Sequence, residues 1–529
     1  MDDVVARLQA ELGAEHVALP GPGLEEYFDP FPLEDPGRYA PGLAVRPADV
    51  EQVQAVLRIA TEARTPVWTV SQGRNNGYGG RSPRVSGSIV LDLSRMNRVL
   101  DIDSVSGTVL LEPGVRFFDL YEALRSAGSP FWPSVPDLGW GSVVGNALDR
   151  GLGYTAYGEH WNSICGMEVV LADGDVVRTG MGAMSASRSW QLYKPGFGPS
   201  LDGIFGQSNL GVVTKMGLWL MPRPERWAAV DVSMPEAEDL GALIDVCRPL
   251  KLSGTIQTVV STADVLGIAS FIGPRSDWYT GEGPIPESVE LDIKERFGLG
   301  RWNQQFGLYG SARELAARLA DVRDAYGALE GARFTVAEYD GDIAPEDVPE
   351  QHRTRAGIPG MYVERMPYWH GGRGGHVAIG PVAPITSEDA LRMRRIIRRR
   401  FEEHGVDYFA VFIAYHRHML HLAQIMFDRD DAELSRRSRE LARVLVQDLA
   451  AEGYGEYRTH VYLMDAVADS FDWNDHALRR LDERIKDALD PAGILSPGKQ
   501  GVWPAAFRDR AERPENEANE ANEANGAQQ

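Results

Sequence analysis

The residues best suited to chemistry begin in a glycine-rich loop, residues 66–80 (PVWTVSQGRNNGYGG), whose first part is a short apolar run. Glycines accept positive φ and let successive backbone N–H groups point at one anion, as in phosphate-binding loops. The spacing matches neither a Walker A loop nor a G-x-G-x-x-G fingerprint, so a hairpin without a ligand explains it equally well. Tyr78 favours a ligand, because a tight turn has no need of a large aromatic ring.

A second block, residues 131–160, is also dense in glycine and small polar residues. Its Pro136-Asp137 pair fixes a turn and presents a carboxylate, although an aspartate after proline most often caps a helix or a turn. The block therefore offers either an acid–base group or a plain capped turn. A second candidate backbone cradle follows at Gly139, Gly141, Ser142, Gly145 and Asn146.

Tyr457 and Arg458 are neighbours in the segment EYRTHVYLMD, residues 456–465. Neighbours on a strand point to opposite faces, so both side chains reach one ligand only at a strand end or a bend. The alternative is a tyrosine at the edge of the core beside an arginine in a surface salt bridge. Lys499, in a Pro-Gly-Lys turn, is either part of a plain loop or a lysine directed at a ligand.

Histidines occur in two predicted strands. Residues 408–427 read as one strand with His416, His418 and His421, of which the first two share a face and the third takes the other. A metal site built from all three would need a bulge, so we favour histidines on a polar face or hydrogen-bonded within the sheet, and predict no metal.

The shorter strand, residues 376–380, follows a glycine-rich loop and stops at Pro381. His376, Ala378 and Gly380 share one of its faces. Spacing alone favours His376 as an ordinary polar residue at a strand start.

Composition excludes several classes of protein. The chain has 529 residues, 43% of them hydrophobic and 25% charged, which is typical of a globular protein of a few domains. Its formal net charge of -22 disfavours nucleic acid or an anionic membrane surface as a partner. No apolar run is long enough to span a bilayer, and the first residues (MDDVVARLQAEL) predict an acidic amphipathic helix and no signal peptide. The two cysteines, Cys165 and Cys247, form no disulfide framework, so we expect a reducing, cytoplasmic environment.

The helices and strands that must position these residues change in length and spacing near residues 222–226. Before that point short elements alternate, with predicted helices at 48–64 and 117–126 and strands at 67–70, 88–93, 99–102 and 107–111. After it come longer helices at 234–247, 311–329, 388–404 and 431–452, and strands at 255–260 and 408–426. The alternation predicts an α+β fold of two domains. Residues 509–529, with NEA three times, predict a disordered acidic tail.

Several segments, taken together and in order, resemble the vanillyl-alcohol oxidase family of flavoproteins, and within it the 4-alkylphenol oxidases. They are GRNNGYGG, VPDLGWGSVVGNALDRGLGYTAYGEH, RTGMGA, PGFGPSLDGIFGQSNLGVVTKMG, GGHVAIGPVAP, GYGEYRTH and DPAGILSPGKQGVW. The resemblance implies a two-domain FAD-binding fold of the PCMH type. Residues 1–225 and 456–508 would form the FAD-binding domain, and residues 226–455 an α+β cap over the flavin ring.

The resemblance also implies how FAD is held. His376 matches the histidine to which such enzymes attach FAD through its 8α-methyl carbon, so we expect a covalent flavin. Some relatives use an N-terminal histidine to assist attachment, but here His16 is the only histidine before His160, so attachment is expected to be slower or assisted differently. The remaining FAD-binding positions are Ser71, Gly73, Arg74, Asn75, Asn76, Gly77, Gly141, Ser142, Asn146, Arg458 and Lys499.

Tyr78, Tyr457 and Arg458 match the family's phenol-binding set. A free phenol has a pKa of about 10, and two hydroxyls with a fixed cation lower that pKa by stabilising the phenolate. Electron push from the phenolate expels hydride from the benzylic carbon to flavin N5 and leaves a p-quinone methide. Asp137 matches the carboxylate beside N5, where it activates water or takes the proton of a benzylic alcohol. The pocket is expected to be lined by Tyr154, Ala378, Gly380, Val411 and Ile413, with Gly380 leaving room for methoxy groups.

The implied activity is an FAD-dependent oxidase of para-substituted phenols such as vanillyl alcohol, eugenol or lignin-derived aromatics, with O2 as electron acceptor and hydrogen peroxide as product. The alternative is a 4-cresol-type dehydrogenase that uses a cytochrome. Those relatives attach FAD to a tyrosine, so His376 favours the oxidase, although the acidic surface would suit a basic cytochrome. A metal enzyme built on the three histidines and a nucleotide-binding module without catalysis are less favoured. The family implies a homodimer or a larger homo-oligomer.

Overall fold

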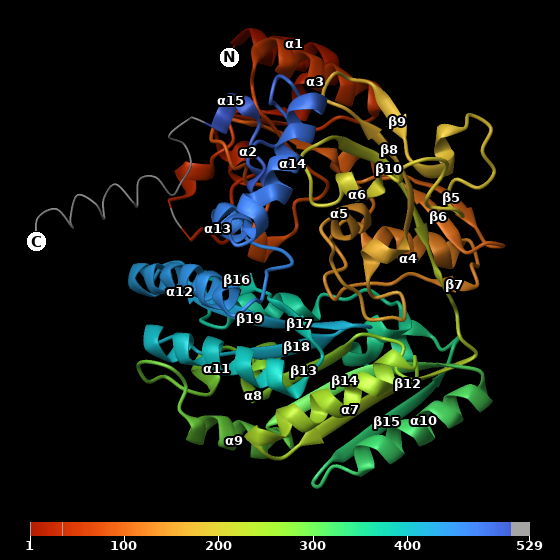
Figure 1. Cartoon of the computed structure of the whole chain (residues 1–529), viewed down its shortest axis with the longest axis vertical. Helices are drawn as coiled ribbons and strands as arrows, with labels where there is room; N and C mark the ends of the chain where they lie inside the picture. The colour runs from red at the N-terminus through yellow and green to blue at the C-terminus, as the bar shows by residue number, and fades with distance from the viewer. Residues whose placement is uncertain (1, 34, 509–529) are drawn as a thin grey trace, which may run out of the picture.

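The computed structural model describes residues 2–33 and 35–508. The tail predicted at 509–529 lies outside the described residues. In Figure 1 the N-terminal elements (red to yellow) and the C-terminal helices α13–α15 (blue) lie together in the upper half, and the elements between them in sequence form the lower half. The chain therefore leaves the upper half once and returns to it.

The first sheet carries the glycine-rich loop at the end of one of its strands. Its order is β1-β2-β4-β3, with β2, β4 and β3 parallel and β1 antiparallel to β2. Helix α3 begins where the Asp49 carboxylate accepts a hydrogen bond from the Gln52 N–H (2.8 Å), and its apolar side chains pack with α1 against the sheet. The bounds are α1 (Asp2–Leu12), β1 (Val17–Ala18), α2 (Pro22–Glu25), β2 (Leu43–Val45), α3 (Val50–Ala63), β3 (Val67–Val70) and β4 (Ile89–Asp92).

The second sheet is antiparallel throughout, in the order β5-β6-β10-β8-β9. Helices α4 and α5 pack on it and hold the second glycine-rich block at its edge. A two-stranded ribbon, β7 with β11, leads into the lower half. The bounds are β5 (Val99–Asp103), β6 (Thr108–Leu111), α4 (Phe117–Ser126), β7 (Phe131–Trp132), α5 (Val143–Leu148), β8 (Ile164–Val170), β9 (Val176–Arg178), α6 (Asp202–Phe205), β10 (Val212–Trp219) and β11 (Met221–Pro222).

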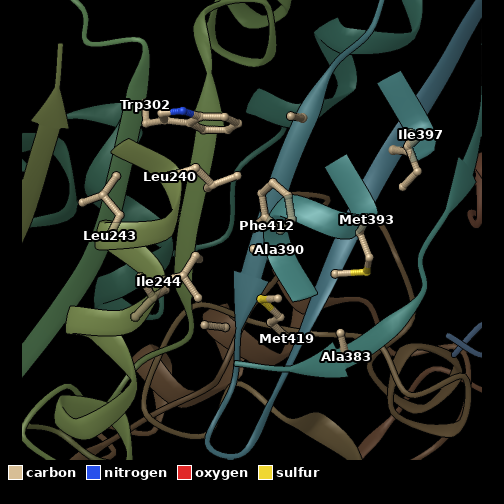
Figure 2. Close-up of a cluster of buried hydrophobic side chains, with 14 of the residues drawn as sticks. Leu240, Leu243, Ile244, Trp302, Ala383, Ala390, Met393, Ile397, Phe412 and Met419 are labelled. Carbon is tan, nitrogen blue, oxygen red and sulfur yellow. The ribbon is translucent and has the colours of Figure 1, made fainter. Parts of the chain in front are cut away.

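The lower half is built on an eight-stranded sheet in the order β15-β12-β14-β13-β18-β19-β16, with β17 paired to β19. Helices α7, α10, α11 and α12 cover one face, and Figure 2 shows side chains of α7 and α11 directed at Trp302, Phe412 and Met419 of the strands. The strands are β12 (Arg226–Met234), β13 (Val260–Asp264), β14 (Trp302–Gly310), β15 (Arg333–Asp340), β16 (Gly374–Ile379), β17 (Val382–Pro384), β18 (Ala410–Ala414) and β19 (His418–Asp428). The helices are α7 (Leu240–Leu252), α8 (Val265–Ile272), α9 (Glu287–Phe297), α10 (Ala312–Gly327), α11 (Ser387–His404) and α12 (Ala432–Ala451).

The single strand predicted at 408–426 is wrong, because it is a hairpin of β18 and β19. The turn closes with a bond from the Tyr415 N–H to the His418 carbonyl (2.8 Å) and leaves His416 exposed. His418 stacks on Tyr415 (ring centroids 4.5 Å apart), whereas buried His421 bonds through Nε2 to the Tyr408 hydroxyl (2.8 Å). The three histidines do not converge. In the described ranges no group of three His, Cys, Asp or Glu side chains is arranged to hold a metal.

Two other predicted elements begin later than expected. The strand predicted at 255–260 is β13, which starts at Val260, and the helix predicted at 234–247 is α7, which starts at Leu240. Met234 instead closes β12, which pairs along both edges with β14 and β15, and this pairing prevails over the helical pattern of the residues that follow.

The segment after residue 455 returns to the first sheet. The Val67 N–H donates to the Ile494 carbonyl (2.7 Å), and the Ser496 N–H donates to the Val67 carbonyl (2.7 Å). Residues 456–465 form no strand beyond one bridge from Glu456 to Pro381, and they enter α13 instead. The last helices are α13 (Met464–Asp469), α14 (Trp473–Leu489) and α15 (Ala505–Arg508). Every strand of the eight-stranded sheet lies within 226–455, and the exact domain boundaries stay a prediction.

Candidate active site

A cavity lies where the loop after β3, the segment before α5, residues 363–367 and the loop before α13 meet. Each predicted cofactor position contributes to its wall, and so does Tyr78. These residues are Ser71, Gly73, Arg74, Asn75, Asn76, Gly77, Tyr78, Gly141, Ser142, Asn146, His376, Arg458 and Lys499. The fold thus brings three glycine-rich or polar loops, far apart in sequence, to one place.

The glycine-rich loop needs its glycines for two different reasons. Gly79 has φ +101°, a conformation that side chains rarely adopt. Gly77 has an ordinary φ, but a Cβ there would lie 2.6 Å from Nε2 of His376. The absence of a side chain at Gly77 therefore lets the loop pass directly against the strand that carries His376.

The second cradle is held by its own polar side chains. The Ser142 hydroxyl donates to the Pro113 carbonyl (2.6 Å) and accepts from the Gly145 N–H (2.9 Å), which caps α5. Asn146 bonds through Oδ1 to Nδ1 of His160 (2.6 Å). Because an amide oxygen only accepts, Nδ1 of His160 carries the proton, and burial lowers the pKa of His160 to about 4, so the ring is neutral. The sequence analysis missed this histidine.

Tyr78, Tyr457 and Arg458 form one cluster, although 379 residues separate the two tyrosines. Their hydroxyl oxygens lie 3.5 Å apart, and the Arg458 guanidinium carbon is 3.9 Å from the centroid of the Tyr78 ring. Tyr457 and Arg458 both lie in a bend of a loop, so the two neighbours reach the same place, as the prediction required. Burial raises the pKa of Tyr457 well above its ordinary value against the opposing effect of Arg458, so the hydroxyl stays protonated.

Arg458 is a half-buried cation, and its shielded Nε has no hydrogen-bond partner in the described structure. Among the residues that the structure describes it makes no ion pair, although Tyr457, Tyr78 and Asp149 favour its charged form. Buried arginines elsewhere in the chain are paired, such as Arg84 with Asp465. A shielded guanidinium stays charged, so this site is prepared for an anionic group.

His376 lies on β16 with its ring 5.4 Å from that of Phe31. Burial, with a smaller contribution from His460, lowers the pKa of His376 to about 4, so its imidazole is neutral. Its buried Nδ1 has no partner in the described structure. Close by, Asp29 approaches Nε2 of His460 to 2.8 Å and accepts a hydrogen bond from the Phe31 N–H (2.9 Å).

Asp137 stands between two residues that line the cavity, Pro136 and Leu138, but does not line it itself. Its Oδ1 accepts a hydrogen bond from the Tyr362 N–H (3.2 Å), which ties it to the opposite side of the site. Burial raises the pKa of Asp137 to about 6, although that hydrogen bond opposes the shift. A carboxylate with a pKa in this range can accept and release a proton near neutral pH.

The predicted pocket residues surround Tyr457 only in part. Tyr154, Val411 and Ile413 pack in the same apolar cluster as the Tyr457 ring. Ala378 is buried on β16 and does not line the cavity. The expectation for Gly380 is corrected: a Cβ there would lie 2.7 Å from Cε1 of Tyr457, so the space beside Gly380 holds the tyrosine ring and is not left for a methoxy group.

Comparisons with known proteins agree with this architecture. Residues 41–180 match a family model described as FAD binding domain, and residues 366–500 match one described as FAD linked oxidases, C-terminal domain. The chain is 36% identical to the 4-cresol dehydrogenase [hydroxylating] flavoprotein subunit of Pseudomonas putida, over 94% of this chain and 95% of that protein. It belongs to the PCMH-type family of FAD-binding oxidases. It is therefore an FAD-dependent oxidoreductase, and the predicted resemblance and fold are confirmed.

Solved structures of this family superpose on nearly the whole flavoprotein. The 4-ethylphenol oxidase of Gulosibacter chungangensis, in a complex with isoeugenol, matches with a TM-score of 0.92 and 36% identity over 96% of this chain and 98% of that one. A p-cresol methylhydroxylase with substrate bound matches with a TM-score of 0.90 and 34% identity over 95% and 97%.

The cavity of this flavoprotein suits FAD in its chemistry. Four buried polar atoms on its wall lack a partner among the described residues: Asn75 Oδ1, His376 Nδ1, Arg458 Nε and Thr459 Oγ1. Both donors and acceptors are present, as a cofactor with a pyrophosphate and a polar ring system requires. In the described part of the chain no helix is long and apolar enough to span a bilayer.

Besides His160, three further residues of the site escaped the sequence analysis. Gln207 has φ +49°, unusual for a residue other than glycine, and donates from Nε2 to the Tyr457 carbonyl (2.9 Å). Thr459 and Glu456 flank the Tyr457-Arg458 pair and are buried. Their residue types are common in loops, so only their burial distinguishes them.

Proposed function

We propose that this flavoprotein oxidises para-substituted phenols, such as 4-hydroxybenzyl alcohols and 4-alkyl- or 4-allylphenols, and returns the electrons to O2. The observation that carries the proposal is the cluster of two tyrosine hydroxyls around Arg458, a cation on the cavity wall that forms no ion pair in the described structure. Such a site favours a phenolate over the neutral phenol, because a buried cation gains most from a bound anion. The phenol-oxidising relatives give the proposal independent support.

The roles of the side chains follow from that charge. Tyr78 and Tyr457 donate hydrogen bonds to the phenolate oxygen, and Arg458 balances its charge. The phenolate pushes electrons toward the para substituent, so the benzylic carbon can release a hydride and become a p-quinone methide. Bound FAD supplies the two-electron acceptor for this step. Asp137 takes the proton from the water that adds to the quinone methide, or from the hydroxyl of a benzylic alcohol.

We further propose that FAD is attached covalently to His376. The supporting observations are that its imidazole is neutral and that Nδ1 has no partner on the cavity wall. A neutral ring nitrogen with a free lone pair is a nucleophile, whereas a protonated one is not. The absence of a histidine in residues 17–159 leaves any assistance of the attachment to other residues.

Oxygen is the proposed acceptor because a histidine stands at the attachment position, where the cytochrome-dependent relatives have a tyrosine. The alternative is a dehydrogenase that passes its electrons to a cytochrome. One relative, named as the flavoprotein subunit of a dehydrogenase, supports this alternative. We also propose that residues 1–225 with 456–508 form the FAD-binding domain, that residues 226–455 form the cap, and that the chain assembles as a homo-oligomer.

One set of measurements tests these proposals. The purified holoprotein is precipitated with acid, and the absorption of pellet and supernatant is recorded for the wild type and for His376→Ala. Yellow colour in the wild-type pellet and in the variant's supernatant supports attachment at His376. Oxygen consumption and peroxide formation are then measured with 4-ethylphenol and vanillyl alcohol. Flavin reduction without oxygen uptake would favour the cytochrome-dependent alternative, and no flavin reduction by either phenol would refute the proposed substrate class.

A further inference from the structure

A second cavity lies behind the Tyr457-Arg458 pair, between residues 203–210, the loop at 456–459 and helices α13 and α14. It shares part of its wall with the first cavity, including Gln207, Arg458 and Thr459. Glu456 lines the second cavity only. This carboxyl group has no part in the proposed chemistry, yet it immediately precedes the phenol-binding residues.

Glu456 is a buried carboxyl group with only one of its two oxygens hydrogen-bonded. The residue is 8% exposed, one oxygen accepts a hydrogen bond from the Gly380 N–H (2.6 Å), and the other oxygen has no partner among the described residues. The charged side chains that line the same cavity are Arg150, Arg458, Arg479 and Asp482, and in the described structure none of them forms an ion pair with Glu456. Burial without a cation raises the pKa of Glu456 to about 8, although the bond from Gly380 opposes the shift.

The hydrogen bond between Glu456 and Gly380 links Glu456 to the position of the Tyr457 ring. Gly380 is the residue whose missing side chain makes room for the Tyr457 ring. The backbone closes the same contact, because the Tyr457 N–H reaches the Gly380 carbonyl (3.4 Å) and Glu456 bridges to Pro381. Glu456 thus fastens the loop of Tyr457 and Arg458 to the end of β16. Without that bond the Gly380 N–H would be left unpaired in the interior.

We propose that Glu456, through its hydrogen bond with the Gly380 N–H, is a positioning residue that fixes Tyr457 and Arg458 for phenol binding. The inference rests on the proposed function, since it concerns the same site. A neutral acid completes the bond to Gly380 without adding charge. An ionised Glu456 would add a buried negative charge whose potential reaches Tyr457, where the phenolate is to bind. Ionisation therefore weakens phenol binding in alkaline solution.

The test uses the holoenzyme and 4-bromophenol, a phenol without a benzylic C–H, so that binding is measured without turnover. The dissociation constant is obtained from the change in flavin absorption for the wild type, Glu456→Gln, Glu456→Leu and Asp482→Asn. Glutamine keeps an acceptor for the Gly380 N–H but cannot ionise. Asp482 lines the same cavity without contacting Gly380, so its variant is the matched control.

We expect the ratio of wild-type to Glu456→Gln dissociation constants to stay near unity at about pH 6.5 and to rise to about tenfold at about pH 9, one unit above the pKa of Glu456. The ratio cancels the ionisation of the ligand itself. Glu456→Leu should bind at least about tenfold more weakly at every pH, because it leaves the Gly380 N–H unpaired. Asp482→Asn should follow the wild type.

Two results would overturn the inference: a ratio that does not change with pH, or Glu456→Leu binding 4-bromophenol as tightly as Glu456→Gln does. A wild-type holoenzyme that fails to bind 4-bromophenol at about pH 6.5 would overturn the proposed function, and this inference with it. The two failures are distinguishable, because the first leaves wild-type binding intact.

Discussion

Replacing Arg458 by methionine should lower phenol turnover with little loss of stability, because this cation forms no ion pair in the described structure and its Nε has no hydrogen-bond partner. Methionine removes the charge and keeps most of the side-chain volume. The comparison is Arg84→Met: the Arg84 side chain is fully buried, pairs with Asp465 and donates to the Val461 carbonyl, whereas Arg458 lies on the cavity wall without an ion pair. The two variants remove the same group from places that differ in their partners.

Arg458→Met should lower kcat/KM, whereas Arg84→Met should lower the stability of the protein. A hydrogen bond to a charged group contributes about 1.5–3 kcal/mol, so loss of Arg458 from a bound phenolate should lower kcat/KM by about 10- to 150-fold. The melting temperature should change little, because Arg458 forms no ion pair whose loss would leave a buried charge behind. Loss of Arg84 leaves the buried Asp465 carboxylate without its counter-ion, although Trp503 still donates a hydrogen bond to it (2.8 Å), and this loss costs about 3–5 kcal/mol of stability.

The assay is oxygen consumption with 4-ethylphenol, combined with thermal unfolding of each holoprotein at one pH. A ligand-binding role for Arg458 would be excluded if Arg458→Met lowered the melting temperature as much as Arg84→Met and left kcat/KM unchanged. That pattern would make Arg458 a structural residue whose counter-charge lies elsewhere in the protein.

Two further predictions concern Asp137 and Gly380. Because the pKa of Asp137 is raised to about 6, a role as a base predicts that wild-type kcat decreases when the pH is lowered below about 6. Asp137→Asn should lose most of the activity, and the remaining activity should not show this decrease at acid pH. Because the pKa of Asp137 is higher in the folded state than in the unfolded state, ionised Asp137 destabilises the protein. Asp137→Asn should therefore be more stable than the wild type by up to about 3 kcal/mol at pH 7, and this difference should vanish as the pH falls toward about 4. A denaturant titration that found the variant less stable at pH 7 would contradict this prediction. In Gly380→Ala the new Cβ must displace the Tyr457 ring, which should cost about 1–3 kcal/mol in phenol binding, measured as a rise in the dissociation constant of 4-bromophenol. An unchanged constant would show that Tyr457 can shift without loss.

The amino-acid sequence predicted those parts of the protein that depend on local pattern. The helix at 388–404 corresponds to α11, capped by Thr386 at one end and by Gly405 in the left-handed conformation at the other. The glycine-rich loops were found because backbone that must approach a ligand closely needs glycine, and this requirement is visible in the residue types themselves. The family resemblance rested on the same loops.

Tertiary structure decided which distant residues meet and which side chains lose water. The turn between β18 and β19 leaves His416 exposed, whereas a continuous strand would have placed it on the same face as His418. The space beside Gly380 holds the Tyr457 ring and not a methoxy group of the substrate. Spacing along a strand could not predict this, because it does not reveal what packs against the strand from another loop. The roles assigned to Arg458 and Glu456 depend on polar atoms that are shielded from water and have no partner in the described structure. Burial is a property of the whole fold, since the energy of a charge depends on every group that replaces its water, and no local pattern encodes it.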